Sequence, residues 1–328
     1  MSQNQLFRKA LETGIRSGAD SLVFEIFKYQ AEQNSIYNNY CGALKIAPEQ
    51  IENIEKIPFL PISFFKNHPI RTGNFFPEIT FSSSGTTSET TSKHEIRSLD
   101  NYELSFIHAF KKFYGDPADW VILGLLPSYL ERTGSSLIYM VEKLIKMSGK
   151  TDSGLFLYDH QKLKQIIERN EEVGQKSLLI GVTFALLDFA KEFRGKLNHT
   201  VIMETGGMKG RGEELTREEV AEILKKSFGT TTIHSEYGMT EMLSQAYSNG
   251  NGRFKCPPWL KVMIRDPSDP LAVSSSGSGV INIIDLANID SCCFIATQDL
   301  GKVYEDGTFE IHGRMDHSDI RGCNLLIL

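Results

Sequence analysis

Residues 237–241, Tyr-Gly-Met-Thr-Glu, bring four side-chain chemistries together within five positions. The ring of Tyr237 can cover a flat base, and Gly238, which lacks a Cβ, lets a ligand approach the backbone. The Thr240 hydroxyl can bind a phosphate oxygen, and the Glu241 carboxylate can bind a hard cation such as Mg²⁺. The segment therefore predicts a nucleotide and Mg²⁺ site, although an ordinary strand-to-helix turn would also explain so short a motif.

A second polar segment, residues 81–88, has the sequence Phe-Ser-Ser-Ser-Gly-Thr-Thr-Ser. Its hydroxyl and backbone N–H groups can converge on phosphate oxygens, and the cations of Lys93 and Arg97 follow closely. The segment lacks the Gly-Lys-Ser/Thr triplet of a Walker-type loop, and a solvated linker would have a similar composition. The residues predicted to bind phosphate are Ser83, Ser84, Gly85, Thr86 and Thr87.

A third motif, Thr-Gln-Asp-Leu-Gly at residues 297–301, follows the apolar run Cys293–Ala296. We therefore expect Asp299 at the end of a strand, where its carboxylate can accept hydrogen bonds from both hydroxyls of a ribose. The alternative is that Asp299 only initiates a turn before the following glycine.

A fourth motif, Gly-Arg-Met-Asp, occupies residues 313–316. Its arginine, Arg314, can bind ribose or phosphate. The alternative role for Arg314 is a surface ion pair with Asp316 or Asp319.

Taken in order, the four motifs resemble those of the adenylate-forming superfamily, which includes acyl-CoA synthetases and adenylation domains. Within it the chain is most similar to the acyl-protein synthetase family, the fatty-acid-activating component of bacterial luminescence fatty acid reductase. The most specific match is Arg-Gly-Cys at residues 321–323, because that family carries its acyl-accepting cysteine near the C-terminus in a basic-Gly-Cys context. Other matching segments are Phe59–Lys66, Glu204–Lys209, Cys256–Trp259 and Arg265–Pro267.

The resemblance implies an α/β fold like the N-terminal core of adenylate-forming enzymes, with parallel sheets covered by helices and a smaller β-rich lobe. It also implies ATP and Mg²⁺ as cofactors. The residues that it places at the site are Gly206, Gly207, Tyr237, Gly238, Asp299 and Arg314 for the nucleotide, Thr240 and Glu241 for catalysis, and Glu241 for Mg²⁺.

The activity that the resemblance implies is that of an ATP-dependent acyl-protein synthetase. Such an enzyme activates a fatty acid as acyl-AMP, transfers the acyl group to its own cysteine, here Cys323, and delivers it to an acyl reductase. Because the sequence ends soon after Gly-Arg-Met-Asp, we expect the C-terminal lid domain of full-length ligases to be absent.

Two other functions stay open at this point. One is a stand-alone acyl-CoA ligase or acyltransferase that uses another thiol, with Cys323 only a tail residue. The other is a non-enzymatic subunit of a reductase complex. The intact motif at residues 237–241 argues against the second, since a scaffold has no use for a Mg²⁺ carboxylate.

Composition excludes several classes of function. The 328 residues carry a net charge of −6, and no clustered basic face predicts nucleic-acid binding. No apolar run reaches the ~18 residues of a membrane span, and the N-terminus lacks a signal-peptide profile. Five cysteines without a C-x-x-C pair favour a reducing cytoplasm over a disulfide or zinc framework. The sequence also allows a homo-oligomer.

Periodicity predicts a helical N-terminal layer at residues 1–72, an α/β nucleotide-binding core at 73–258, and a β-rich lobe with the C-terminal tail at 259–328. Apolar strands alternate with helices in the core, which predicts a mostly parallel sheet covered on both faces. The expected strands are 121–126, 178–182 and 200–203, and the expected helices are 101–113, 136–148, 160–173, 183–195 and 216–227.

Overall fold

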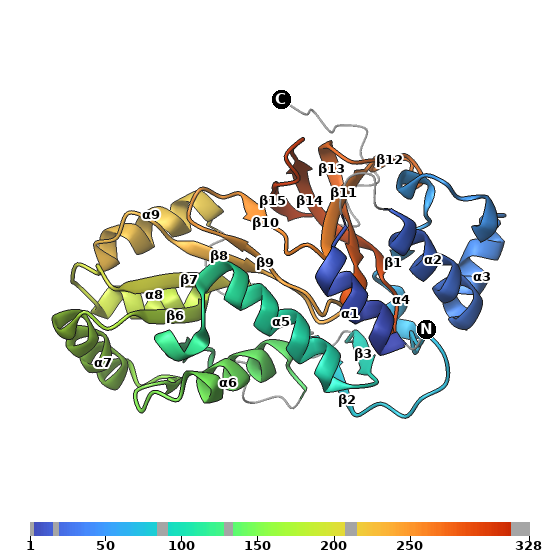
Figure 1. Ribbon diagram of the computed structural model, residues 1–328. Helices are drawn as coiled ribbons and strands as arrows, with labels where there is room; N and C mark the ends of the chain where they lie inside the picture. The colour runs from blue at the N-terminus through green and yellow to red at the C-terminus, as the bar shows by residue number, and fades with distance from the viewer. Residues whose placement is uncertain (1–2, 16–19, 84–90, 128–133, 207–214, 316–328) are drawn as a thin grey trace. The chain divides into compact units, whose positions relative to one another are not determined.

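The computed structural model describes residues 3–15, 20–83, 91–127, 134–206 and 215–315. The chain divides into two compact units (Figure 1). Residues 75–257 form one, here called the central unit, and residues 1–74 together with 258–328 form the other, the terminal unit. The helical N-terminal segment and the β-rich C-terminal segment expected from the sequence are therefore parts of one unit.

A mostly parallel sheet forms the core of the central unit. Its strands, in spatial order, are β5 (Gly154–Leu155), β4 (Val121–Leu125), β6 (Ser177–Val182), β7 (Thr200–Thr205), β8 (His234–Tyr237), β9 (Ala246–Ser248) and β10 (Phe254–Lys255). The first five are parallel, and β9 and β10 pair antiparallel. Every residue of β4 and β6 is buried, as expected for strands covered on both faces.

Five longer helices cover this sheet: α5 (Leu99–Tyr114), α6 (Ser136–Ser148), α7 (His160–Val173), α8 (Thr183–Glu192) and α9 (Arg217–Phe228). Helices α5 and α6 lie on one face, and α7, α8 and α9 lie on the other (Figure 1). This division follows from right-handed crossovers, because the chain moves outward from β4 to β5 and then back across the sheet toward β8. The predicted α/β fold class is confirmed.

Local capping explains why the helix limits were readable from sequence. Ser135 accepts a hydrogen bond from the Ile138 N–H at the start of α6, and Asp159 accepts one from the Lys162 N–H at the start of α7. Thr216 and Glu219 form a capping box at the start of α9. These three helices end at glycines with left-handed backbone, namely Gly149, Gly174 and Gly229.

The central unit also contains a short hairpin apart from the main sheet. Its strands are β2 (Ile79–Ser82) and β3 (Lys93–Ile96), which pair antiparallel. The serine-rich segment predicted to bind phosphate connects these two strands. A 3₁₀ turn, η3 (Pro117–Asp119), precedes β4.

An antiparallel sheet forms the core of the terminal unit. Its strands, in spatial order, are β12 (Val273–Ser274), β11 (Leu260–Arg265), β13 (Gly277–Asp285), β14 (Phe294–Val303) and β15 (Phe309–Arg314). A two-residue strand, β1 (Leu60–Pro61), pairs parallel with β14.

Helices from the N-terminal part of the chain pack in the terminal unit: α1 (Gln3–Thr13), α2 (Ser21–Gln33), α3 (Ser35–Ala43) and α4 (Phe64–Asn67), with 3₁₀ turns η1 (Pro48–Gln50), η2 (Ile54–Lys56) and η5 (Leu286–Asn288). Phe27 of α2 contacts Phe294 of β14 edge to face, at 5.7 Å between ring centres. Tyr37 of α3 stacks on Phe294 at 6.0 Å. These aromatic contacts join α2 and α3 to β14.

A buried glutamine on α2 adds polar contacts to this core. The Gln30 amide nitrogen donates to the carbonyl oxygens of Asn288 and Ile289, each at 3.0 Å. Its amide oxygen accepts from the Cys293 N–H at 2.8 Å. Gln30 thus satisfies backbone groups of the irregular stretch that leads into β14.

We expect Gln30→Leu to lower the free energy of unfolding by about 2–4 kcal/mol, because it leaves buried carbonyl and N–H groups without partners. Urea denaturation measures the change. Gln33→Leu on the same helix, where the side chain is exposed, is the matched control and should change stability by less than about 0.5 kcal/mol. Equal effects of the two substitutions would contradict this role of Gln30.

Candidate active site

The motif at residues 237–241 lies at the carboxyl end of β8. Tyr237 closes the strand and is 7% exposed, with its ring 5.9 Å from that of Phe254. Gly238 is exposed, Thr240 is half-buried, and Glu241 is only 6% exposed. A ligand at this turn would therefore meet the bare backbone of Gly238, while most of the Tyr237 surface is covered by protein.

A buried histidine joins the β2–β3 hairpin to this turn. His94 of β3 is 1% exposed, and its Nδ1 lies 2.9 Å from the Thr240 carbonyl oxygen. Burial lowers the pKa of His94 to about 4, so the ring is neutral at pH 7. Two motifs that are far apart in sequence are thus neighbours, and sequence reasoning did not identify the histidine that connects them.

The stem of the serine-rich segment is closed by reciprocal hydrogen bonds. Ser83 N–H donates to the Ser92 carbonyl oxygen at 3.0 Å, and Ser92 N–H donates to Ser83 Oγ at 2.9 Å. Ser83, one of the predicted phosphate ligands, is therefore engaged in holding this stem. The other predicted ligands of this segment, Ser84, Gly85, Thr86 and Thr87, lie outside the described residues.

Gly206 follows β7 directly. It is exposed and has a left-handed backbone with φ of 81°, which a residue with a Cβ adopts only with strain. Since Thr205 of β7 pairs with Glu236 of β8, the turn after β7 begins beside the turn after β8. Ligands of open α/β sheets bind at such carboxyl ends of parallel strands. Gly207 lies outside the described residues.

Two buried glutamates at these strand ends were not identified from the sequence. Thr183 Oγ1 donates to Glu204 at 2.5 Å, and Thr205 Oγ1 donates to Glu236 at 2.5 Å. Burial, with a smaller contribution from the Glu204 charge, raises the pKa of Glu236 to about 7. A carboxyl group that titrates near neutrality beside a candidate ligand site is a candidate functional group.

The other predicted ligand residues, Asp299 and Arg314, lie in the terminal unit. They face each other across β14 and β15, and Arg314 Nε lies 3.5 Å from Asp299 Oδ1. The Asp299 side chain is 14% exposed and that of Arg314 is 64% exposed. The structure thus joins these two predicted residues in an ion pair.

The segment that carries Asp299 bulges out of the sheet. Pairing between β13 and β14 passes from Val280 opposite Leu300 to Asn282 opposite Ala296. Three residues of β14, numbers 297–299, therefore stand opposite the single residue Ile281. Bulges of this kind redirect side chains and are common beside functional sites.

A buried arginine binds the backbone groups that this bulge leaves unpaired. Arg265 of β11 is 8% exposed and donates to the carbonyl oxygens of Ile281 at 3.0 Å and Thr297 at 2.5 Å, and to Asn282 Oδ1 at 2.7 Å. Thr297 Oγ1 in turn accepts from the Asp299 N–H at 3.1 Å. Sequence reasoning did not assign this role to Arg265, because the bulge is visible only once the strands are paired.

Three of the four cysteines among the described residues are poor nucleophiles because they are buried, and the fourth is half-exposed. Burial raises the pKa of Cys41 to about 12 and raises those of Cys292 and Cys293 further. Cys256 is half-exposed. The predicted acyl acceptor, Cys323, lies outside the described residues.

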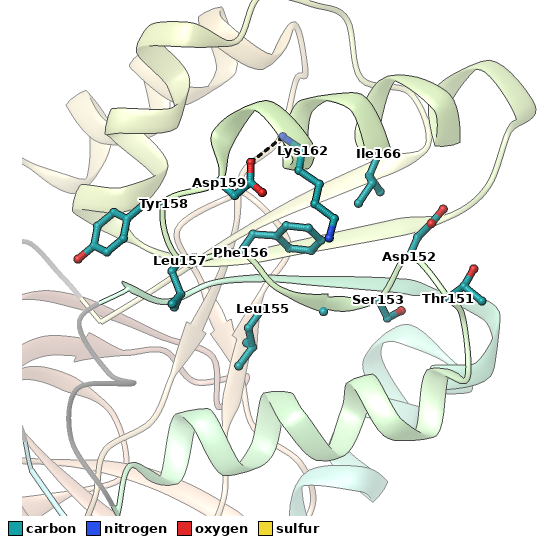
Figure 2. A pocket seen from close by; sticks show the side chains of 11 residues that line it. Thr151, Asp152, Ser153, Leu155, Phe156, Leu157, Tyr158, Asp159, Lys162 and Ile166 are labelled. Atoms are coloured by element: carbon teal, nitrogen blue, oxygen red, sulfur yellow. Dashed lines mark hydrogen bonds between the residues drawn. The ribbon is translucent and has the colours of Figure 1, made fainter.

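A cavity of about 340 Å³ opens elsewhere in the central unit, beside β5 and the start of α7 (Figure 2). Residues 151–159, Lys162 and Ile166 line it. The Lys162 ammonium group lies 5.9 Å from the centre of the Phe156 ring. None of the residues predicted from the motifs lines this cavity.

Within the described ranges, no cluster of three or more His, Cys, Asp or Glu side chains could hold a metal ion. A single carboxylate such as Glu241 still suits Mg²⁺, which keeps most of its water and takes phosphate oxygens as ligands. No helix in the part of the chain that the structure describes is long and apolar enough to cross a membrane.

Comparison with known proteins gives relatives that match nearly the whole chain. The long-chain-fatty-acid–luciferin-component ligase of Vibrio harveyi is 23% identical over 326 residues, which are 93% of this chain and 85% of the relative. The protein of the same name from Aliivibrio fischeri is 24% identical over 332 residues, with shares of 93% and 86%. No protein-family model matches the chain.

Solved structures share the fold. ATP-bound MatB from Rhodopseudomonas palustris matches with a TM-score of 0.54 and 17% identity over 72% of this chain and 47% of that enzyme. MenE from Bacillus subtilis, solved with ATP and a magnesium ion, matches with a TM-score of 0.51 and 16% identity over 72% of this chain and 49% of MenE. The chain spans about half the length of these enzymes.

The resemblance to the acyl-protein synthetases and to the adenylate-forming superfamily is confirmed. The chain is similar to fatty-acid ligases along nearly its whole length, and it has the fold of adenylate-forming enzymes. These similarities support the predicted ATP-dependent ligase.

We expect Arg265→Met to lower the free energy of unfolding by about 2–4 kcal/mol, because two buried carbonyl oxygens and one amide oxygen lose the guanidinium as donor, and the Ile281 oxygen keeps only Thr297 Oγ1. Urea denaturation measures this effect. Arg8→Met, at an exposed position of α1 in the same unit, is the control and should have little effect. If Arg265→Met unfolds at the wild-type urea concentration, the bulge does not depend on the guanidinium.

Proposed function

We propose that the chain is an ATP-dependent acyl-protein synthetase, which activates a fatty acid as acyl-AMP and then holds the acyl group as a thioester on Cys323. The observation that carries the proposal is the similarity to fatty-acid ligases over 93% of the chain. The convergence of motif residues at the carboxyl ends of β7 and β8 supports it. ATP and Mg²⁺ as cofactors are part of the proposal, and ATP-bound and Mg²⁺-bound structures of the same fold support them.

In the first step a carboxylate oxygen of the acid attacks the α-phosphorus of ATP. The bond from that phosphorus to the bridging oxygen of pyrophosphate breaks, which gives acyl-AMP and pyrophosphate. The Thr240 hydroxyl orients the phosphates together with the backbone beside Gly206 and Gly238. The Asp299 carboxylate accepts hydrogen bonds from the ribose hydroxyls. These contacts hold the reacting atoms in line, which is where most of the rate gain in such a transfer arises.

Glu241 is the proposed protein ligand of Mg²⁺. The ion, when bound, offsets the negative charge that builds up on the phosphate oxygens. Burial of the Glu241 side chain, which is 6% exposed, keeps the carboxylate in one position. A fixed carboxylate needs no reorganisation during the reaction.

In the second step the Cys323 sulfur attacks the carbonyl carbon of acyl-AMP, the C–O bond to AMP breaks, and the thiol proton leaves to solvent or a base. A thiolate is required, and free cysteine with a pKa of about 8.5 is only partly ionised at pH 7. Cys41, Cys292 and Cys293 are poorer acceptors, because burial raises the pKa of each thiol.

Delivery of the acyl group to an acyl reductase and a cytoplasmic location complete the proposal. The sequence has five cysteines and no C-x-x-C pair, which suits a reducing compartment. A panel of carboxylic acids incubated with the protein, ATP and Mg²⁺ and followed by mass spectrometry tests it. An acyl adduct on Cys323 supports the proposal, free acyl-CoA alone in the presence of coenzyme A supports a stand-alone ligase, and no reaction supports a non-enzymatic subunit.

We expect Glu241→Gln to slow acid-dependent pyrophosphate exchange by roughly 100-fold or more, because loss of a metal carboxylate removes several kcal/mol of charge stabilisation. The variant should stay folded, which circular dichroism checks. Glu218→Gln, at an exposed position of α9, is the matched control and should exchange at the wild-type rate. A near wild-type rate of pyrophosphate exchange in the Glu241 variant would show that Glu241 is not the Mg²⁺ ligand.

We expect Cys323→Ser to retain pyrophosphate exchange and to lose the stable acyl-enzyme, because all proposed adenylation residues lie upstream. Hydroxylamine-sensitive labelling with radioactive acid measures the second half-reaction separately. Cys256→Ser, at the half-exposed cysteine, is the matched control and should label normally. A label that persists at wild-type stoichiometry in Cys323→Ser would place the acyl group elsewhere.

A further inference from the structure

A row of polar side chains crosses the sheet at the carboxyl ends of β7 and β8. Thr205 of β7 pairs with Glu236 of β8, which pairs in turn with Tyr247 of β9. Directly paired residues point to the same face of a sheet, so the three side chains form one row. Within it, Thr205 Oγ1 donates to Glu236 Oε2 at 2.5 Å. Glu236 is 8% exposed.

The second carboxyl oxygen of Glu236 lies against the turn that follows β8. A Cβ added to Gly238 would meet Glu236 Oε1 at 2.5 Å, so the space that a side chain would fill is taken by the carboxyl group. Gln245 lies on the same side, with its Cγ 3.5 Å from that position. Glu236 therefore contacts β7 through one oxygen and the ligand-facing turn after β8 through the other.

Apart from the Thr205 hydroxyl, whose hydrogen bond lowers the pKa of Glu236, the surroundings of Glu236 favour its neutral form. Glu204 on β7 carries a like charge, while Tyr102 and Tyr114 of α5 and Tyr247 of β9 are the titratable groups on the covering side. Burial, and then the charge of Glu236, raises the pKa of each of these tyrosines. No cation in the described part of the chain forms an ion pair with Glu236.

We propose that Glu236 is a positioning residue for the nucleotide site. Its carboxyl group ties the end of β7 to the end of β8, through Thr205 on one side and the bare backbone of Gly238 on the other. It thereby fixes the two points at which the chain leaves these strands, Gly206 and Gly238. The inference rests on the proposed function in that both strand ends are taken to face ATP.

The protonation state of Glu236 sets the charge beside the proposed ATP site. The hydrogen bond from Thr205 favours the ionised carboxylate, but burial and the Glu204 charge together outweigh it. The neutral carboxyl group sits in its buried position without an unpaired charge. When Glu236 ionises, the Glu204 charge repels it and a negative group faces the turn that must accept phosphate. Since burial raises the pKa of Glu236 to about 7, affinity for ATP should fall as the pH rises from 6 to 8.

Three threonine variants test the tie, with the dissociation constant of MgATP from titration calorimetry as readout. Thr205→Val removes the hydroxyl and should weaken binding about 5–10-fold, whereas Thr205→Ser keeps a donor and should bind within about 2-fold of wild type. The matched control is Thr200→Val, since Thr200 Oγ1 donates to Glu171 at 2.7 Å at the opposite end of the same strand. Equal binding by the two valine variants would overturn the proposal.

Glu236→Gln tests the role of the proton. The amide mimics the neutral carboxyl group, so this variant should bind MgATP equally well at pH 6 and pH 8, while the wild type loses affinity. A parallel loss of affinity in both proteins would overturn the proposal. The readout is binding, so it stays informative even if the wild-type protein binds ATP without catalysing pyrophosphate exchange. That outcome would contradict the proposed reaction but not the positioning role of Glu236.

Thermal unfolding gives a readout that needs no ligand. The pKa of Glu236 is raised from 4.5 to about 7 in the folded state, so its contribution to stability is present below pH 4.5 and is lost as the pH rises through 7. Relative to wild type, Glu236→Gln should gain about 2–5 °C in Tm between pH 5 and pH 8. A constant difference in Tm would show that Glu236 does not titrate in this range and would overturn the protonation step.

Discussion

The in-register parallel pairing of β7 with β8 is the constraint on which the candidate site depends. It sets Glu204 beside Ser235 and Thr205 beside Glu236, so the turns that follow the two strands start at the same level of the sheet. Because side chains alternate along a strand, a slip of one residue would turn Thr205 away from Glu236. The hydrogen bond between His94 and the Thr240 carbonyl oxygen then adds the β2–β3 hairpin to the same edge.

The sequence was sufficient for the α/β architecture because its local signals agree with the tertiary structure. Helices α6 and α7 occupy the residues expected from periodicity, and each has a side-chain cap at its start and a left-handed glycine at its end. Buried strands such as β6 read as continuous apolar runs. Capping, periodicity and apolar runs are short-range features, which a single sequence displays directly.

Long-range features were not accessible in the same way. The grouping of the N-terminal helices with the C-terminal sheet depends on contacts such as that of Gln30 with Asn288, which are 258 positions apart. Because Gln30 binds backbone groups, no complementary side chain marks its partner. The same reason hid Arg265, whose acceptors include carbonyl oxygens freed by a bulge. Glu236 was hidden for a different reason, because its burial depends on β7 and α5 rather than on its own neighbours in sequence.

The two buried ionisable side chains, Arg265 and Glu236, form no ion pair within the described part of the chain, and this decides how the site is held. An apolar side chain at either position would avoid the free energy that desolvating a charge requires. At Arg265, however, such a replacement would leave the carbonyl oxygens of Ile281 and Thr297 without this donor. At Glu236 it would leave the Thr205 hydroxyl without its acceptor. The motif residues bring the ligand chemistry, and buried polar groups outside the motifs hold the irregular backbone that presents them.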